Sequence, residues 1–358
     1  MGVATAEATA NIAVVKYWGK RDEKLVLPMN GSLSFTMDEQ LKTRTSVLFS
    51  DEFSQDELWL NGTKMDLSDK ETAERMQQLD VIRAKAKTKA KAKIVSYNSF
   101  PTAAGFASSA AGLAALACAA SKAAGLNLSA QELSILARLG SGSACRSVLG
   151  GFVEWKKGTK ADGSDSVAMQ IASHTHWPEL RNVIAIVDAG KKKVSSRAGM
   201  KQTIATSVLY KSRQDYLPKL IENVKKSVLA KDFGTFGELI MRESSNMHAV
   251  MLDTWPPIMY LNDYSKQIMY SVGDYNASEG EIVAAYTFDA GPNAHVYTTE
   301  SQVDSIKKML SEIEGVNKTM VCKVGAGPKY LDEGHLISED GGVLKAHFDE
   351  KKKDLVLD

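Results

Sequence analysis

Residues 98–124 read NSFPTAAGFASSAAGLAALACAASKAA, and the other informative parts of the chain are best understood from this stretch. Residues 93–97 before it alternate enough to form a strand, which Pro101 ends because proline cannot donate a ladder hydrogen bond. Small residues follow, and the Ala/Leu run 110–124 predicts a helix with Gly125 just past its end. A strand, a small-residue loop and a helix N-terminus together favour phosphate binding, because the free N–H groups and the helix dipole attract an anion.

Two hydroxyls in the small-residue loop just before this helix, those of Ser108 and Ser109, are available to a phosphate or a magnesium ion. Neither of the two commonest phosphate-binding patterns, G-x-x-x-x-G-K-[ST] and G-x-G-x-x-G, occurs in the stretch. A buried, Ala-rich helix with a tight entry turn therefore stays open as an alternative.

A cationic loop with two aromatic residues follows a buried strand near the N-terminus. The strand covers residues 10–15 and continues into Lys16-Tyr17-Trp18-Gly19-Lys20-Arg21-Asp22. Four potential anion donors lie within six residues around one glycine, and a plain solvated loop seldom carries both Tyr and Trp. We therefore expect this loop to hold phosphate, with a solvated charged loop as the alternative.

A second backbone nest for an anion is predicted at residues 140–147, which read GSGSACRS. Arg146 follows the glycines and serines, and its planar fork suits a carboxylate or a phosphate. A further cationic, hydroxyl-rich loop, KKKVSSR at 191–197, precedes a long helical region. On that loop alone, a solvated surface role is the simpler interpretation.

A single acid lies between two apolar strands in residues 282–297, where Asp289 begins the sequence D-A-G-P-N. Such an acid is desolvated unless it is paired, and desolvation raises a carboxyl pKa toward the range of a general base. A turn-capping Asp is the alternative, since Asp-x-Gly turns are common.

Composition excludes several classes of protein. The 358 residues carry 44 Lys+Arg against 43 Asp+Glu, so no global basic field favours nucleic acid or an anionic membrane surface. No run of eighteen apolar residues and no H-E-x-x-H pattern occurs. The three cysteines have no metal-binding spacing, which favours free thiols in a reducing compartment.

The remaining segments give coarser predictions. Residues 32–37 and 43–50 are expected to form a hairpin, and Ser68 is expected to cap a helix over 68–83 with Glu71. The Lys/Ala run 84–93 is interpreted as a solvated connector. We expect an N-terminal lobe over 1–187, a C-terminal lobe over 188–330 and a loosely held charged tail over 331–358.

Taken together, four motifs resemble one family: NIAVVKYWGKRD, SFPTAAGFASSAAG, GSGSACRS and AYTFDAGPNA. They are similar to those of diphosphomevalonate decarboxylases, in the superfamily of galactokinase, homoserine kinase, mevalonate kinase and phosphomevalonate kinase. The likeness covers about residues 5–300 in the same order. It implies an α/β (α+β) fold of two lobes with a deep cleft, and a cytoplasmic homodimer in isoprenoid and sterol biosynthesis.

The resemblance also implies a reaction and its residues. ATP, brought with Mg²⁺, and (R)-5-diphosphomevalonate would give ADP, phosphate, carbon dioxide and isopentenyl diphosphate. No metal ligands from the protein are expected. The implied catalytic residues are Asp289, Arg146, Ser109 and Lys16. The implied substrate-binding residues are Tyr17, Trp18, Gly19, Lys20, Ser141, Gly142, Ser143, Ala144, Cys145, Arg146, Ser196 and Arg197. The implied ATP-binding residues are Asn98, Pro101, Ala103, Ala104, Gly105, Ala107, Ser108 and Ser109.

Two other functions stay open at this point. A mevalonate-type kinase would phosphorylate without decarboxylation, although the Asp289 motif favours the decarboxylase over the plain kinases. A catalytically inactive relative would only bind phosphorylated metabolites. We expect no nucleic-acid partner and no membrane association.

Overall fold

Three antiparallel-rich sheets form the framework of the computed structural model, which describes residues 2–100, 108–187, 193–349, 351–352 and 354–358. The first sheet has the order β16-β1-β6-β9-β7-β8, the second β11-β10-β5-β2 and the third β13-β14-β12-β15. Two short pairs, β3-β4 and β17-β18, complete the described strands. The first sheet is formed by β1 (Ala4–Thr9), β6 (Lys42–Ser50), β7 (Glu57–Leu60), β8 (Thr63–Lys64), β9 (Lys91–Asn98) and β16 (Lys329–Leu331).

The other sheets contain the strands on which most of the predicted site residues lie. The second sheet is formed by β2 (Asn11–Val15), β5 (Ser32–Thr36), β10 (Phe152–Trp155) and β11 (Ala168–Ala172). The third sheet is formed by β12 (Leu180–Val187), β13 (Ala284–Phe288), β14 (Ala294–Thr299) and β15 (Val316–Cys322). The short pairs are β3 (Lys20–Asp22) with β4 (Leu27–Pro28), and β17 (Ala346–Asp349) with β18 (Asp354–Leu357).

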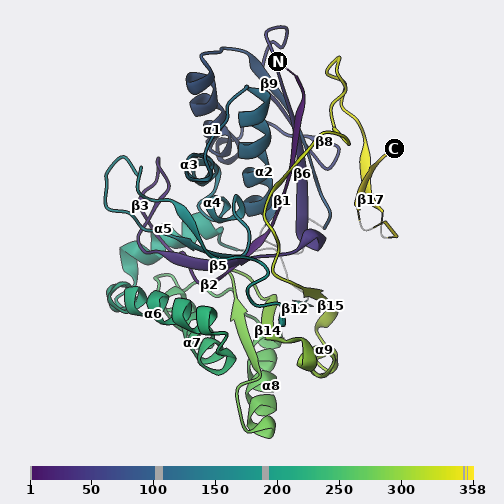
Figure 1. Ribbon diagram of the computed structural model, residues 1–358. Helices are drawn as coiled ribbons and strands as arrows, with labels where there is room; N and C mark the ends of the chain where they lie inside the picture. The colour runs from purple at the N-terminus through teal and green to yellow at the C-terminus, as the bar shows by residue number, and fades with distance from the viewer. Residues whose placement is uncertain (1, 101–107, 188–192, 350, 353) are drawn as a thin grey trace.

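One face of the first sheet is covered by helices, as Figure 1 shows. These helices are α1 (Lys70–Ala86), α2 (Ser108–Ala123), α3 (Ala130–Gly140) and α4 (Ala144–Ser147). The Ala-rich helix expected at 110–124 is α2, and it packs against β1 and β6 with Ala114 and Ala117 fully buried. Gly125 takes a φ of +73° just past the helix end, as the sequence predicted.

The helices of the second half pack partly against the third sheet, in the lower part of Figure 1, and partly against one another and the second sheet. They are α5 (Ser196–Thr206), α6 (Tyr210–Ala230), α7 (Phe233–Leu252), α8 (Asp263–Glu279) and α9 (Val303–Ser311). Phe35 of β5 contacts Phe236 of α7 and Tyr297 of β14, with ring centroids 5.6 and 5.1 Å apart. The two halves are therefore joined by one buried aromatic core.

The position of β12 corrects the lobe boundary expected at 187/188. Every residue of β12 pairs with β14, β15 or both, which belong to the second half. The change of half along the chain consequently lies before Leu180, and β16 then returns the chain to the first sheet beside β1.

Three local predictions were wrong, and the first failed because strand pairing depends on contacts between segments that are distant in the sequence. Strands β5 and β6 do not form a hairpin: β5 pairs with β2 and β10, and β6 with β1 and β9. Asp69, not Ser68, caps α1 by accepting from the backbone of Thr72. The Lys/Ala run 84–93 is not a solvated connector throughout: its first residues end α1, its last residues begin β9, and both Ala90 and Ala92 are buried.

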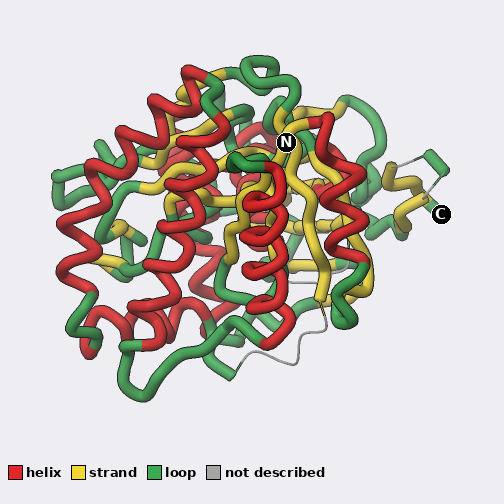
Figure 2. Tube along the Cα trace, turned by 90° about the horizontal axis from the view of Figure 1, so that it is seen from below, coloured by secondary structure: helices red, strands yellow, loops and turns green. Residues whose placement is uncertain are grey.

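The tail after residue 331 is docked, not loosely held. Leu336, Ile337 and Leu355 are buried against Leu48 and Val95 on the face of the first sheet opposite the helices. Asp354 also accepts from Lys42 at 2.7 Å and from Arg44 at 3.0 Å. Seen from below in Figure 2, the terminal hairpin lies at one side of the molecule. None of the helices in the described part of the chain has the length and apolar character needed to cross a bilayer.

Candidate active site

The centre of the site is an ion pair between the ends of two strands from different halves. Lys16 follows β2 and Asp289 follows β13, and Lys16 Nζ lies 2.7 Å from Asp289 Oδ1. The Lys16 side chain is only 2% exposed, whereas that of Asp289 is 40% exposed. The fold thus presents an open carboxylate fixed on a buried cation.

The electrostatics of Asp289 differ from the sequence-based expectation of a raised pKa. Burial raises the pKa of this carboxyl, but Lys16, together with nearby His295 and Arg146, lowers it further, so the net pKa lies below the ordinary value. Asp289 is paired, so the condition under which the sequence would give a desolvated, high-pKa base is not met. Asp289 is an ionised acceptor at neutral pH.

Arg146 is built into the same region by three polar side chains. Its Nε donates to Asn11 Oδ1 at 3.1 Å and to Ser34 Oγ at 2.9 Å, and its Nη1 donates to Ser32 Oγ at 2.7 Å. Arg146 is 2% exposed, and burial lowers its pKa. Among the described residues, Nη2 has no hydrogen-bond partner, so one edge of the guanidinium is available to an anion.

The loop before Arg146 packs directly on Tyr17. A side chain at Gly142 would meet the Tyr17 ring at 2.8 Å, which explains the glycine at this position. Within the described part of the chain, the buried Tyr17 hydroxyl has no hydrogen-bond partner. Burial raises the pKa of this phenol far above 10, so it stays a neutral donor. Ser141 and Ser143 lie beside it, with their hydroxyls 3.3 Å apart.

Trp18 and Gly19 shape the loop through contacts with the second half. Trp18 Nε1 donates to Thr203 Oγ1 at 3.0 Å, and the Tyr210 hydroxyl donates to Trp18 O at 2.6 Å. Gly19 has a φ of +112°, and a Cβ there would overlap the Tyr210 hydroxyl. Lys20, whose side chain is 6% exposed, pairs with Glu23 at 2.6 Å.

Cys145 and Ala144 are buried in the short helix α4. Burial raises the pKa of the Cys145 thiol to about 12. A protonated, buried thiol is a poor nucleophile, so the structure gives Cys145 a packing role.

The two residues predicted on α5 are placed at its first turn. Arg197 donates to Glu74 at 3.0 Å and to the carbonyl of Gly140 at 3.0 Å, and therefore bridges α5 to α1 and to the end of α3. Ser196 is the first residue of α5, and the preceding Ser195 caps the helix. Arg197 lies close enough to Tyr17 for its charge to oppose part of the rise in the Tyr17 pKa that burial causes.

The predicted ATP loop can be described only at its two ends. Pro101, Ala103, Ala104, Gly105 and Ala107 lie outside the described residues, as does the Ser108 side chain. Asn98 ends β9 and accepts from Thr43 Oγ1 at 2.6 Å. Ser109 is in the first turn of α2, because the helix begins at Ser108 and not at Ala110 as expected.

Several residues around the ion pair were missed from the sequence. Ser32 and Ser34 alternate along β5 and so share a face, a signal that could have been used. The others lie far from Lys16 and Asp289 in sequence or are hidden in apolar runs. They are Asn11, Asn30, Arg213, Glu243, Ser244, His248 and His295.

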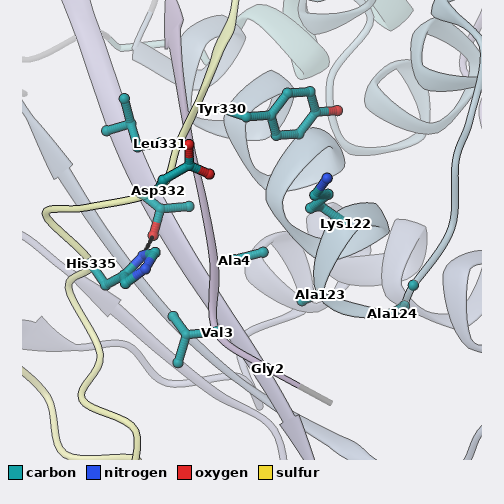
Figure 3. Close-up of a pocket in the computed structure, with 12 residues that line it drawn as sticks. Gly2, Val3, Ala4, Lys122, Ala123, Ala124, Tyr330, Leu331, Asp332 and His335 are labelled. Carbon is teal, nitrogen blue, oxygen red and sulfur yellow. Dashed lines mark hydrogen bonds between the residues drawn. The ribbon is translucent and has the colours of Figure 1, made fainter.

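A separate pocket lies away from this site (Figure 3). It is formed by residues 2–5, the end of α2 at 122–125, and the chain around Tyr330 and His335. The Thr5 hydroxyl bonds His335 Nδ1 there at 2.7 Å. Its lining residues include none of the predicted site residues.

A buried lysine paired with an ionised carboxylate, next to a buried arginine and hydroxyl-bearing loops, defines an enzyme that acts on anionic metabolites. Comparison with known families makes the assignment specific. Residues 8–168 match the diphosphomevalonate decarboxylase-like N-terminal domain, and residues 182–323 match the mevalonate 5-diphosphate decarboxylase C-terminal domain. The chain belongs to the diphosphomevalonate decarboxylase family, as the motifs predicted.

Individual relatives agree over nearly the whole length. The diphosphomevalonate decarboxylase of Candida albicans is 44% identical over 92% of this chain and 98% of its own. The structure of the mevalonate diphosphate decarboxylase from Enterococcus faecalis is similar, with a TM-score of 0.84 at 38% identity. The match covers 93% of this chain and 99% of that one. A second structure, MDDEF in complex with MVAPP, AMPPCP and magnesium, has a TM-score of 0.85 at 40% identity. That match covers 93% of this chain and 99% of the other. The predicted mixed α/β fold is confirmed.

Proposed function

We propose that this enzyme converts ATP and (R)-5-diphosphomevalonate into ADP, phosphate, carbon dioxide and isopentenyl diphosphate, a step of the mevalonate pathway to isoprenoids. The observation that carries the reaction chemistry is the Lys16–Asp289 pair, 2.7 Å apart, with Arg146 near enough to influence Asp289. Family membership over both halves of the chain supports the same reaction.

In the first step, the substrate 3-hydroxyl attacks the γ-phosphorus of ATP. A new O–P bond forms as the bond to the β-bridging oxygen breaks, and ADP leaves. Asp289 accepts the hydroxyl hydrogen bond and takes the proton late, when bonding to phosphorus has made the oxygen acidic. The 2%-exposed Lys16 ammonium keeps this carboxylate ionised and in place.

In the second step, the C3–O bond breaks and phosphate leaves with its bonding electrons. The bond between the carboxylate carbon and C2 then supplies the electron pair of the new C2–C3 double bond, and carbon dioxide is released. Asp289 first passes the proton it has taken to the departing phosphate or to solvent, and the carboxylate, ionised again, then stabilises the positive charge that develops at C3. No additional proton donor is required by this balance.

Substrate anions are assigned to groups that have unused hydrogen-bonding capacity. The Tyr17 hydroxyl and the Ser141 and Ser143 hydroxyls are donors for the diphosphate, with Lys20 as a charged partner. Arg146 offers its free edge to the carboxylate or the diphosphate. The shape of these loops is assigned to Trp18, Gly19, Gly142, Ala144 and Cys145. One side of the substrate site is assigned to Ser196 and Arg197.

ATP is assigned to the loop that contains residues 101–107 and to the first turn of α2 with Ser109. Among the described residues, no group of three His, Cys, Asp or Glu side chains could hold a metal ion. Magnesium would then be carried mainly by the ATP phosphates, whose charge it neutralises. The hydroxyl of Ser109 would be available to a phosphate or to the magnesium that the nucleotide brings.

The experiment that tests the function is a product assay with the purified protein, ATP, magnesium and 5-diphosphomevalonate. We expect equal amounts of ADP, carbon dioxide and isopentenyl diphosphate. ADP without carbon dioxide would instead assign a kinase, and no ADP at all would assign a binding protein.

A homodimer in the cytoplasm is part of the same proposal. Self-association is supported by a cluster of exposed apolar side chains on the α5–α6 turn and at and after the end of α7. The cluster consists of Val208, Leu209, Leu252, Trp255 and Met259. These segments are held together by two hydrogen bonds: the backbone N–H of Leu209 donates to Asp253 Oδ2, and the backbone N–H of Trp255 donates to Thr206 Oγ1. Light scattering should give twice the chain mass for the wild type and the chain mass for Trp255→Glu. A monomeric wild type would exclude the homodimer.

A further inference from the structure

Two adjacent residues of α7, Glu243 and Ser244, hold the backbones on both sides of the catalytic ion pair. Glu243 Oε1 accepts the backbone N–H of Lys16 at 3.0 Å. Ser244 Oγ accepts the backbone N–H of Phe288, the residue before Asp289, at 3.0 Å. One turn of one helix therefore contacts both strand ends that carry the pair.

Arg213 of α6 fixes Glu243 in this position. Its Nη2 lies 2.5 Å from Glu243 Oε1, and both side chains are fully buried. Arg213 Nη2 also lies 3.4 Å from the carbonyl of Lys16, and its Nη1 donates to Asn246 at 2.6 Å. The guanidinium therefore contacts both the carboxylate that holds Lys16 and the Lys16 backbone itself.

The charges in this region form a compact set. Two cations, Lys16 and Arg213, and two anions, Glu243 and Asp289, are connected through the backbone and side chain of Lys16. A buried carboxylate that binds a backbone amide in this way needs its charge balanced, and Arg213 provides the balance. Packing of α6 on α7 would require only the contact between Arg213 and Glu243, but both side chains also contact the backbone of Lys16.

We propose that Glu243 and Ser244 are positioning residues that set the geometry of Lys16 and Asp289 for phosphoryl transfer. Arg213 holds Glu243 in place through their ion pair. None of the three needs to contact substrate, since each acts through the backbone of the pair. The proposal rests on the decarboxylase function proposed above. A misplacement of about 1 Å in such a pair can cost up to about 100-fold in rate, so positioning should be visible in kcat.

The test compares the chain with Ser244→Ala, Glu243→Gln and Arg213→Lys by steady-state and rapid-quench kinetics. We expect kcat to fall about 3- to 10-fold in Ser244→Ala, the loss of one neutral hydrogen bond, with KM for both substrates within about twofold. Glu243→Gln should fall further, up to about 100-fold. The ADP burst should slow by the same factor, which places the defect in phosphoryl transfer.

Matched controls lie on the same helix. Ser245→Ala changes the neighbouring, exposed serine, and Glu238→Gln breaks the exposed Arg242–Glu238 pair. Both should keep wild-type kcat. In an Asp289→Asn background, Ser244→Ala should add no further loss, because its effect passes through Asp289.

Normal kcat per folded molecule in Ser244→Ala, with only a lower Tm, would overturn the proposal, as would a loss that stays fully additive with Asp289→Asn. If Glu243→Gln does not fold, Ser244→Ala still decides the matter. Absence of isopentenyl diphosphate from the wild type would contradict the proposed function, which is a separate outcome.

Discussion

Asp289 is an acceptor whose charge is set by a partner 273 residues away in the chain. Its position at the end of an apolar strand could be predicted from the sequence, and so could the cationic loop that contains Lys16. The contact between them could not, because it depends on the packing of the second sheet against the third. This contact reverses the expected direction of the Asp289 pKa shift.

The three hydrogen-bond partners of Arg146 could not be predicted from the sequence either. The GSGSACRS motif identified the arginine, but Asn11, Ser32 and Ser34 are more than 100 residues away. Buried polar groups must be satisfied, and a sequence does not reveal which of its many serines does so.

We predict that Arg146→Lys does not restore function. The fork uses Nε and Nη1 to hold three side chains, and a lysine ammonium cannot reproduce this planar geometry while also meeting an anion. The expected loss in kcat/KM is about 100-fold or more, the equivalent of two charged hydrogen bonds. Steady-state kinetics would measure it, with the exposed Arg242→Lys as the control. Activity near that of the wild type would reduce Arg146 to a generic positive charge.

At the scale of elements, the existence of β2, β9, α2, β12 and β13 was predictable, since each has a clear apolar period or run. Strand pairing was not, as the partners of β5 and β6 show. The Lys/Ala run illustrates why. Its alternation has the period of a strand, but its charge favoured a solvated connector, and only the neighbours β6 and β7 make burial of one face favourable.

The terminal hairpin gives a prediction at this scale. Leu355→Ala should lower the free energy of unfolding by about 2–5 kcal/mol, because Leu355 is 3% exposed in the core beneath the hairpin. Leu357→Ala, at a position 42% exposed, should change it by about 0.5 kcal/mol or less. Chemical denaturation would measure both. Equal small effects would mean that the tail contributes nothing to stability.

At the scale of the molecule, the two halves cannot be separated at a linker. Phe35, Phe236 and Tyr297 form a common core, and α7 supports strand ends from both halves. The sequence located a change from strands to helices but contained no signal for this shared core. The active site is consequently a property of how the halves pack, not of either half alone.

Two histidines, the partly buried His248 and the buried His295, contribute to the pH dependence of stability. Burial lowers the pKa of His248 and of His295 to about 4, below the ordinary 6.5. Below pH 6.5 the unfolded chain binds protons that the folded chain does not, so stability falls as the pH falls. The loss is about 1.4 kcal/mol per pH unit for each histidine down to about pH 4.

His248→Asn removes one of these groups. The difference in unfolding free energy between wild type and variant should therefore shift by about 1 kcal/mol per pH unit between pH 6.5 and 5, in favour of the variant as the pH falls. Urea unfolding at several pH values would measure it. A difference that does not change with pH would mean that His248 binds its proton equally in both states.

The central claim, that Asp289 held by Lys16 performs phosphoryl transfer, is tested most directly by rapid-quench analysis of Asp289→Asn. The amide keeps the shape but cannot take the proton, so ATP and 5-diphosphomevalonate should bind almost as before. We predict that ADP formation slows by about 10²- to 10⁴-fold and that carbon dioxide falls in step. Release of ADP and carbon dioxide at the wild-type rate would contradict the account, and ADP without carbon dioxide would confine Asp289 to the second step.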